Sequence, residues 1–186
     1  MLNQPANNQR PIGGFTLIEL MVSIGVFAVV MTLAAGAYIT VINMSRTAQA
    51  ISTAVDSVSY AMEYMTREIR TGTQFGCNGI TFNDCAAGGT SFSVLDQSGS
   101  QVTFSLQNSA INVTSSTYVG STALTDAAVT ITGITFYVSG TKPYSNAQDI
   151  APPAVTIVVT GTVTTGKGAA IPFTVESGAE MRGIDL

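Results

Sequence analysis

The chain has 186 residues, of which 46% are hydrophobic and only 10% are charged, and its formal net charge is -4. This length suits one domain with an extension and argues against two domains. Histidine is absent and only two cysteines occur, which excludes His-based triads, HExxH sites and four-ligand zinc sites. Because the few basic residues are scattered, we expect no nucleic-acid interface. The apolar bias is typical of a membrane-associated or secreted chain.

Residues 1–14 are polar, carry one positive charge at Arg10 and end in two glycines, a pattern typical of a leader peptide. No charge occurs from Leu20 to Val41, and about 20 such residues suffice to span a bilayer as a helix. We therefore predict a transmembrane helix within residues 15–42. The basic residue before it places the leader in the cytoplasm and the remainder of the chain outside.

The pattern then predicts an amphipathic continuation over residues 43–72, as part of one helix from Phe15 to Thr71. Its apolar positions recur at alternating spacings of four and three residues, and they are Ile51, Val55, Val58, Met62, Met65 and Ile69. Arg70 lies in the last turn and Gly72 follows as a C-cap. We expect this apolar stripe to pack on the following domain, with a separate coiled coil as the alternative.

Residues 73–186 are rich in Ser, Thr, Gly and β-branched residues and predict an extracytoplasmic β-sheet domain. Apolar and polar residues alternate, as in half-buried strands, in the segments 92–94, 102–106, 111–113, 129–131, 134–138, 155–159 and 171–175. The turn-like stretches DQSGS, QNSA and TGKGA separate strands; the first two predict a β-meander from Thr90 to Thr114, and Gly133 marks a bulge. The predicted class is α+β, with a long N-terminal helix packed on a C-terminal antiparallel β-sheet domain.

The stretch GG-FTLIELMVSIGVFAVV closely resembles the N-terminal signature of type IV pilins and type II secretion pseudopilins. The resemblance runs from Gly14 to about Val30: a leader with a basic residue ends in glycine, and Phe-Thr-Leu-Ile-Glu-Leu opens a hydrophobic helix. It implies the pilin fold. It also implies that a prepilin peptidase cleaves after Gly14 on the cytoplasmic side, and that the new amino group on Phe15 is then methylated.

Glu19 heads the apolar run, where a carboxylate entering lipid costs on the order of a few kcal/mol. It follows the new N-terminus by about one helical turn. A buried charge becomes tolerable when it is paired. We therefore hypothesise that Glu19 of an incoming subunit pairs with the Phe15 ammonium of a neighbour already docked, so that the lone charge acts as an assembly signal.

The resemblance implies a structural subunit with no catalytic residues and no cofactor. Many major pilins have a proline part-way along the mature helix and a C-terminal disulfide loop, whereas this chain has Gly36 at the matching position and no cysteine beyond Cys85. With Arg182 near the C-terminus, the strand pattern is more similar to minor pilins of the W class and to J-type pseudopilins. A minor pilin is the preferred interpretation and a type II secretion pseudopilin the alternative.

The resemblance also implies partners and a location. The partners are the prepilin peptidase/methyltransferase, other pilin subunits and the inner-membrane assembly platform. We expect a single-pass protein of the cytoplasmic membrane with its C-terminal domain outside. After assembly, it would belong to a cell-surface or periplasmic filament.

Other interpretations of the chain remain open. The stretch AGA at 35–37 fits the small-x-small rule of signal peptidase, which would make Tyr38 the mature N-terminus. A membrane-anchored binding module, such as an adhesin, would use the helix as a fixed anchor without polymerising. An enzyme with a Ser-Lys pair would need Lys142 or Lys167, which lie in turn-rich stretches with no nucleophile motif beside them, so we do not expect one.

Cys77 and Cys85 bracket a short segment with turn-forming residues. In an exported domain, two cysteines this close predict a disulfide, with two reduced thiols as the alternative. Carboxylates fall in several predicted turns, at Asp84, Asp96, Asp126 and Asp149. Without EF-hand spacing we interpret them as solvated turn residues rather than a calcium site, and we expect no metal. Phe82 and Tyr144 are candidates for exposed contact residues, with packing as the alternative.

Overall fold

The computed structural model describes residues 13–117, 120–142, 152–165 and 168–182. Some predicted features lie outside these ranges, namely residues 1–12 of the leader, Tyr144, Asp149 and Lys167. The chain divides into two compact units, Met1–Met44 and Ser45–Leu186. One long helix contributes residues to both units.

This helix, α1, extends over Leu17–Thr71 and has 55 residues. It begins slightly after Phe15, the predicted start, and ends at Thr71 as predicted. In the first unit α1 is the only regular element among the described residues, and all of those up to Val41 are exposed. The uncharged run therefore presents apolar side chains all round the helix, which suits lipid or other helices but not water.

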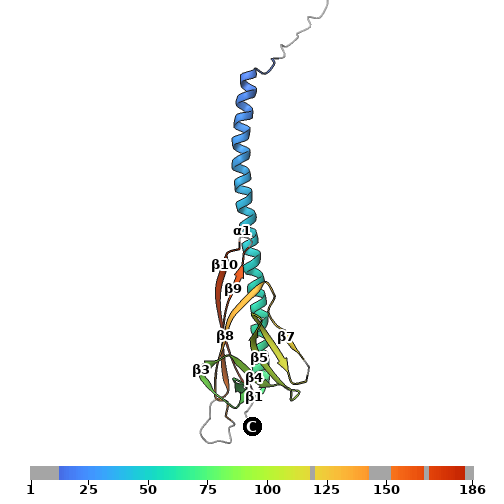
Figure 1. Cartoon of the computed structure of the whole chain (residues 1–186), viewed down its shortest axis with the longest axis vertical. Coiled ribbons are helices and arrows are strands. Elements are labelled where there is room, and N and C mark those ends of the chain that lie inside the picture. Colours follow the sequence, from blue (N-terminus) through green and yellow to red (C-terminus); the bar gives the residue numbers. More distant parts are fainter. Residues whose placement is uncertain (1–12, 118–119, 143–151, 166–167, 183–186) are drawn as a thin grey trace, which may run out of the picture. The chain divides into compact units, whose positions relative to one another are not determined.

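In the second unit α1 buries one face against β strands (Figure 1). The buried residues are Ala54, Val58, Ala61, Met62, Met65 and Ile69. The predicted stripe is confirmed from Val58 onward but wrong at its beginning, because Ile51 and Val55 are 41% and 58% exposed. Ala54 takes their place, since residues 54, 58, 61 and 65 follow one side of a helix. Gly72 N–H donates to the Glu68 carbonyl at 2.8 Å and closes the last turn.

A six-stranded antiparallel sheet has the order β2-β1-β4-β5-β6-β7. Its strands are β1 (Thr73–Cys77), β2 (Ile80–Thr81), β4 (Ser91–Leu95), β5 (Gln101–Gln107), β6 (Ala110–Ser115) and β7 (Ser121–Ala123). The predicted meander is confirmed in β4, β5 and β6. Asn108 and Ser109 both have positive φ, which forms the tight turn between β5 and β6. β1, β2 and β7 were not predicted, because alternation is hard to detect in such short strands.

A second antiparallel sheet has four strands in the order β10-β9-β8-β3. They are β3 (Cys85–Gly89), β8 (Val129–Ser139), β9 (Ala154–Thr164) and β10 (Ala170–Glu180). The bulge predicted at Gly133 is confirmed by a register shift between Ile131 and Gly133. The predicted antiparallel β-sheet domain is confirmed, and its strand order, which the sequence left open, comprises two sheets. The chain leaves the first sheet after β2, and β3 pairs with β8, so the strands divide into two sheets.

Aromatic rings join the two sheets to each other. Phe92 of β4 stacks on Phe136 of β8 with ring centroids 5.7 Å apart, and it meets Phe75 of β1 edge-on at 5.4 Å. Tyr64 of α1 contacts Phe104 of β5 edge-on at 6.1 Å. Burial and the nearby Glu68 carboxylate raise the pKa of the Tyr64 hydroxyl. Such ring pairs each contribute about 0.5–1.5 kcal/mol beyond the area they bury, so this cluster holds helix and sheets together.

Phe136→Ala should lower the free energy of unfolding by about 3–5 kcal/mol, as expected for truncating a buried phenylalanine. Phe136 is fully buried, whereas the adjacent Tyr137 is 41% exposed. Tyr137→Ala is therefore the matched control, with an expected loss of about 1 kcal/mol or less. Urea unfolding of the full chain in detergent, followed by circular dichroism, measures both losses. Equal losses would contradict the assigned core.

Candidate functional site

The peptide bond between Gly14 and Phe15 lies in an exposed stretch that precedes α1. Residues 13–16 have no regular secondary structure and all are exposed. A Cβ placed on Gly13 or Gly14 would meet no atom within 4 Å, and Phe15 is 83% exposed. No described part of the fold therefore shields this bond from an external enzyme.

Thr16 caps the N-terminus of α1. Its Oγ1 accepts a hydrogen bond from the Glu19 backbone N–H at 3.3 Å, and its carbonyl accepts one from the Leu20 N–H at 3.2 Å. Glu19 is thus the third helical residue, and Thr-Leu-Ile-Glu has the spacing of a capping box. Thr16 was not predicted as a cap, although its spacing to Glu19 indicates one. The cap explains why the helix begins at Leu17.

Glu19 lies in the first turn of α1, where the partial positive charge of the helix N-terminus favours a carboxylate. Its side chain is exposed. Among the described residues, the only ion pair joins Arg67 and Glu68 at 3.7 Å. Glu19 therefore has no cationic side-chain partner within that part of the chain, and a cation from another molecule can approach it.

The N-terminal helix and the residues before it match a known motif. Of the helices described, α1 is long and apolar enough to cross a membrane, although a signal sequence also satisfies that criterion. Residues 10–35 match the family model for the prokaryotic N-terminal methylation motif. The chain carries a type IV prepilin signature.

The prepilin signature, which is that of type IV pilins and pseudopilins, includes Gly14, Phe15 and Glu19 and ends well before the first β strand. It supports membership in this family without separating pilins from pseudopilins. No curated protein and no solved structure matches the chain. The architecture agrees with the signature, because one long N-terminal apolar helix packs on antiparallel sheets in a pilin-like α+β arrangement.

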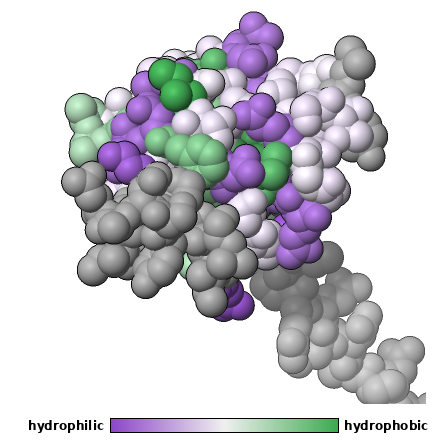
Figure 2. Space-filling model, turned by 90° about the horizontal axis from the view of Figure 1, so that it is seen from below, coloured by the Kyte–Doolittle hydropathy of each residue, from purple (hydrophilic) through white to green (hydrophobic). Residues whose placement is uncertain are grey.

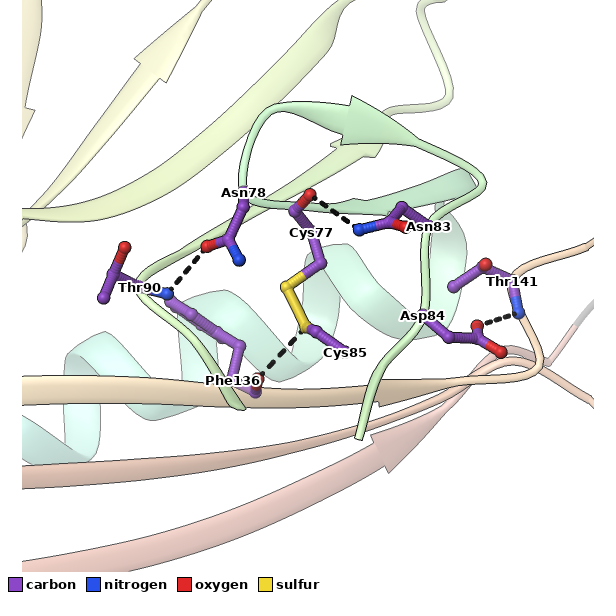
Figure 3. Close-up of a disulfide and its surroundings, with 8 residues drawn as sticks. All are labelled: Cys77, Asn78, Asn83, Asp84, Cys85, Thr90, Phe136 and Thr141. Atoms are coloured by element: carbon purple, nitrogen blue, oxygen red, sulfur yellow. Dashed lines mark hydrogen bonds between the residues drawn. A yellow bond between two sulfur atoms is a disulfide. The ribbon is translucent and has the colours of Figure 1, made fainter. Parts of the chain in front are cut away.

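Cys77 and Cys85 form the predicted disulfide, with Cα atoms 6.2 Å apart. Cys77 ends β1 in one sheet and Cys85 begins β3 in the other, so the bond joins the two sheets (Figure 3). Asn83 Nδ2 donates to the Cys77 carbonyl at 3.4 Å, and Cys85 Sγ lies 3.3 Å from the Phe136 carbonyl oxygen. A Cβ on Gly89 would overlap Cys77 Sγ. Only glycine therefore allows this strand to approach the disulfide so closely.

Two further hydrogen bonds hold the disulfide loop in place. Asn78 Oδ1 accepts the Thr90 N–H at 3.0 Å, and Asp84 Oδ1 accepts the Thr141 N–H at 3.0 Å (Figure 3). Asp84 thus fastens the loop to the residues that follow β8, and it remains exposed. Lys142, which follows Thr141, is exposed.

The candidate contact residue Phe82 is 37% exposed and lies in the disulfide loop, where its neighbour Ile80 is 60% exposed. One end of the Ser45–Leu186 unit is mainly hydrophilic or neutral, with apolar residues in small separate areas (Figure 2). Extended apolar patches are the ones that mark interaction surfaces. The residues that Figure 2 colours by hydropathy therefore form no single extended apolar patch at this end.

The remaining predicted carboxylates in the described ranges stabilise turns. Asp96 Oδ1 accepts the Ser98 hydroxyl at 2.7 Å and the backbone N–H groups of Ser98 and Ser100, both at 2.8 Å. These bonds, that of the Ser98 hydroxyl foremost, lower the pKa of the Asp96 carboxyl. Asp126 Oδ1 accepts the Ala128 N–H at 2.7 Å. Within the described part of the chain, no three His, Cys, Asp or Glu side chains are grouped so as to hold a metal ion.

Replacing both cysteines, as Cys77→Ala with Cys85→Ala, should lower the free energy of unfolding by about 2–3 kcal/mol on the chain-entropy estimate for a short loop. Denaturant unfolding of the full chain in detergent measures this loss. A reductant is the control, because it should bring the wild-type protein down to the stability of the double variant and leave the variant unchanged. A double variant as stable as the wild type would show that the bond contributes nothing to stability.

Proposed function

We propose that this chain is the precursor of a structural subunit of a type IV pilus-like filament, and specifically of a minor pilin. The observation that supports this most strongly is the overlap of the methylation motif over residues 10–35 with an exposed Gly14–Phe15 bond and an uncharged helix after it. A plain membrane anchor would account for the helix alone. The proposal accounts for the motif, the exposed Gly14–Phe15 bond and the uncharged helix together, since all three lie in the same N-terminal segment.

Processing comes first in this proposal. Prepilin peptidase cleaves after Gly14 at the cytoplasmic side, and the amino group of Phe15 is methylated. The cap on α1 would survive the cut, because Thr16 and Glu19 both lie in the mature chain. The new ammonium then stands about one helical turn before the Glu19 carboxylate.

Assembly follows from the cost of the unpaired Glu19 carboxylate in an apolar medium. Two opposite charges 4 Å apart attract by about 4 kcal/mol at an effective dielectric constant of 20, and more strongly as water is excluded. Pairing with the Phe15 ammonium of a docked neighbour removes the cost of a lone charge. A subunit would thus be more stable in a filament, packed against other pilins above the inner-membrane assembly platform, than alone in the membrane.

The minor-pilin assignment is supported by two departures from many major pilins. Gly36 stands where a proline is common, and the disulfide closes a loop directly after α1 instead of a C-terminal loop. A type II secretion pseudopilin fits the same features. The two differ in the filament that contains the chain, so the subunits recovered with it would distinguish them.

The N-terminal peptide of the protein from cell envelopes should begin at Phe15 and be heavier by one methyl group, as measured by mass spectrometry. Gly14→Val should abolish this product, while Gly13→Val, equally free of contacts in the fold, is the matched control and should be cleaved. A start at Tyr38 would instead identify a signal peptide, and an intact Met1 would favour the anchored binding module.

Glu19→Gln should leave cleavage intact but reduce incorporation into filaments at least tenfold, which corresponds to about 1.4 kcal/mol. Glutamine can still complete the capping box, so this variant removes the charge while it keeps the cap. Quantitative immunoblotting of sheared filaments measures incorporation, and Glu63→Ala, an exposed carboxylate on the same helix, is the control. Normal incorporation of Glu19→Gln would disprove the pairing mechanism.

A further inference from the structure

The strand β10 (Ala170–Glu180) forms one edge of the four-stranded sheet, next to β9 (Figure 1). It has 11 residues and pairs with β9 along its whole length. Among the described residues, no strand pairs with its other side. An edge of this kind presents a row of backbone N–H and C=O groups on which a further strand can form.

Two hydrogen bonds at the ends of this pairing show which residues of β10 point outward. Met181 N–H donates to the Pro153 carbonyl at 3.0 Å, and the Ala169 carbonyl accepts the Thr165 N–H at 2.9 Å. Backbone groups alternate between the two sides of an antiparallel strand, and the register between β9 and β10 is continuous. Odd-numbered residues of β10 therefore point to β9. The outward residues are Ala170, Pro172, Thr174, Glu176, Gly178 and Glu180.

Pro172 agrees with this assignment. Proline cannot donate to a ladder, and sheets accept it at an edge where its nitrogen faces away from the partner strand. Pro172 thus removes one outward N–H without disturbing the pairing with β9. From Thr174 to Glu180 each outward residue keeps its N–H. This stretch is about 24 Å long, which suits a short strand from a partner.

The inner face of β10 is apolar at its N-terminal half. The side chains of Ile171, Phe173 and Val175 line a groove of about 440 Å³ against α1, and no residue that lines it is charged. On the helical wall of this groove, Ile51 and Val55 remain 41% and 58% exposed. The side chains of an added strand would alternate as those of β10 do. Those next to the groove should therefore be apolar.

The opposite face of β10 is exposed and acidic. Its even-numbered side chains are exposed, and its only charged residues are Glu176 and Glu180. Glu180 lines a hollow with Arg70 and Arg182, whereas Glu176 does not. Within the described ranges, no cationic side chain forms an ion pair with Glu176. A basic side chain opposite Glu176 would therefore stabilise an added strand.

We propose that the edge of β10 binds an extended segment of a partner protein in which apolar and basic residues alternate. The segment adds a strand to the sheet, with its apolar side chains beside the groove and a basic side chain beside Glu176. Backbone hydrogen bonds supply affinity, and the two faces supply selectivity. A second copy of β10 fits less well, because acidic side chains of both copies would share one face. The proposal goes beyond the filament function and does not depend on it.

A short fluorescent peptide of alternating lysine and valine tests this edge. Fluorescence anisotropy measures its binding to the full chain in detergent. Two N-methylated forms of the peptide are the decisive probes, one methylated on each valine amide and the other on each lysine amide. Because only one set of amides faces β10, one form should bind at least tenfold more weakly than the other. Equal affinities of the two forms, whether high or low, would overturn the proposal.

Variants at Gly178 test whether the peptide pairs with β10. Gly178→Pro removes an outward N–H, as Pro172 does two outward positions earlier, and should weaken binding of the unmethylated peptide at least tenfold. Gly178→Ala is the matched control. It keeps the N–H, and its Cβ would lie 3.5 Å from the Val155 carbonyl oxygen, an ordinary contact, so binding should not change. Equal binding by the two variants would contradict the assigned edge. Circular dichroism checks that both are folded.

A charge reversal that leaves the backbone unchanged provides a further measurement. Glu176→Lys should weaken binding of the lysine-valine peptide at least threefold at low salt and strengthen binding of a glutamate-valine peptide. Glu63→Lys, at an exposed position of α1, is the control and should change neither. An unchanged preference in Glu176→Lys would overturn the assigned selectivity. Self-association that Gly178→Pro abolishes, without peptide binding, would identify a second copy as the occupant and overturn the proposal.

Discussion

The burial of one face of α1 against two sheets is the contact on which the rest of the structure depends. From Ala54 to Ile69 the helix supplies the apolar side chains on which the strands pack, and the fully buried Met65 and Ile69 lie in this region. This burial removes apolar surface from water and gives the Ser45–Leu186 unit its core. Among the described residues up to Val41, no side chain of the helix is buried against another part of the chain. The apolar side chains of the N-terminal half of the helix are therefore exposed, which is compatible with a lipid or protein environment.

The two sheets depend on each other through a small number of contacts. The Phe92–Phe136 ring pair and the Cys77–Cys85 bond both cross from one sheet to the other. The disulfide limits the separation of β1 and β3 in the unfolded chain as well as in the folded one, which is how a short loop contributes stability. Apolar burial and a covalent bond thus act on the same junction.

The residues around the Gly14–Phe15 bond combine a structural and a functional requirement. Thr16 and Glu19 begin the helix by capping, which any stable helix needs. The same carboxylate lies at the entrance to an apolar segment, where a cap alone does not offset the cost of a charge. The motif over residues 10–35 therefore contains an exposed peptide bond, the capped start of a helix and a carboxylate at the head of an uncharged run.

Much of this protein was determined by local sequence. The uncharged run, the long helix ending at Thr71, the β4–β6 meander, the bulge at Gly133 and the pairing of the two cysteines follow from periodicity, composition and spacing. These patterns act over a few residues, so they can be read directly, and Thr16 was missed although its signal was local. Tertiary structure alone decided that the strands form two sheets, that the disulfide joins them and that Ile51 faces Phe173 across a groove. Residues so far apart in sequence come into contact only through the pairing of strands and the packing of a helix face on them. Local sequence preferences do not specify this long-range pairing and packing.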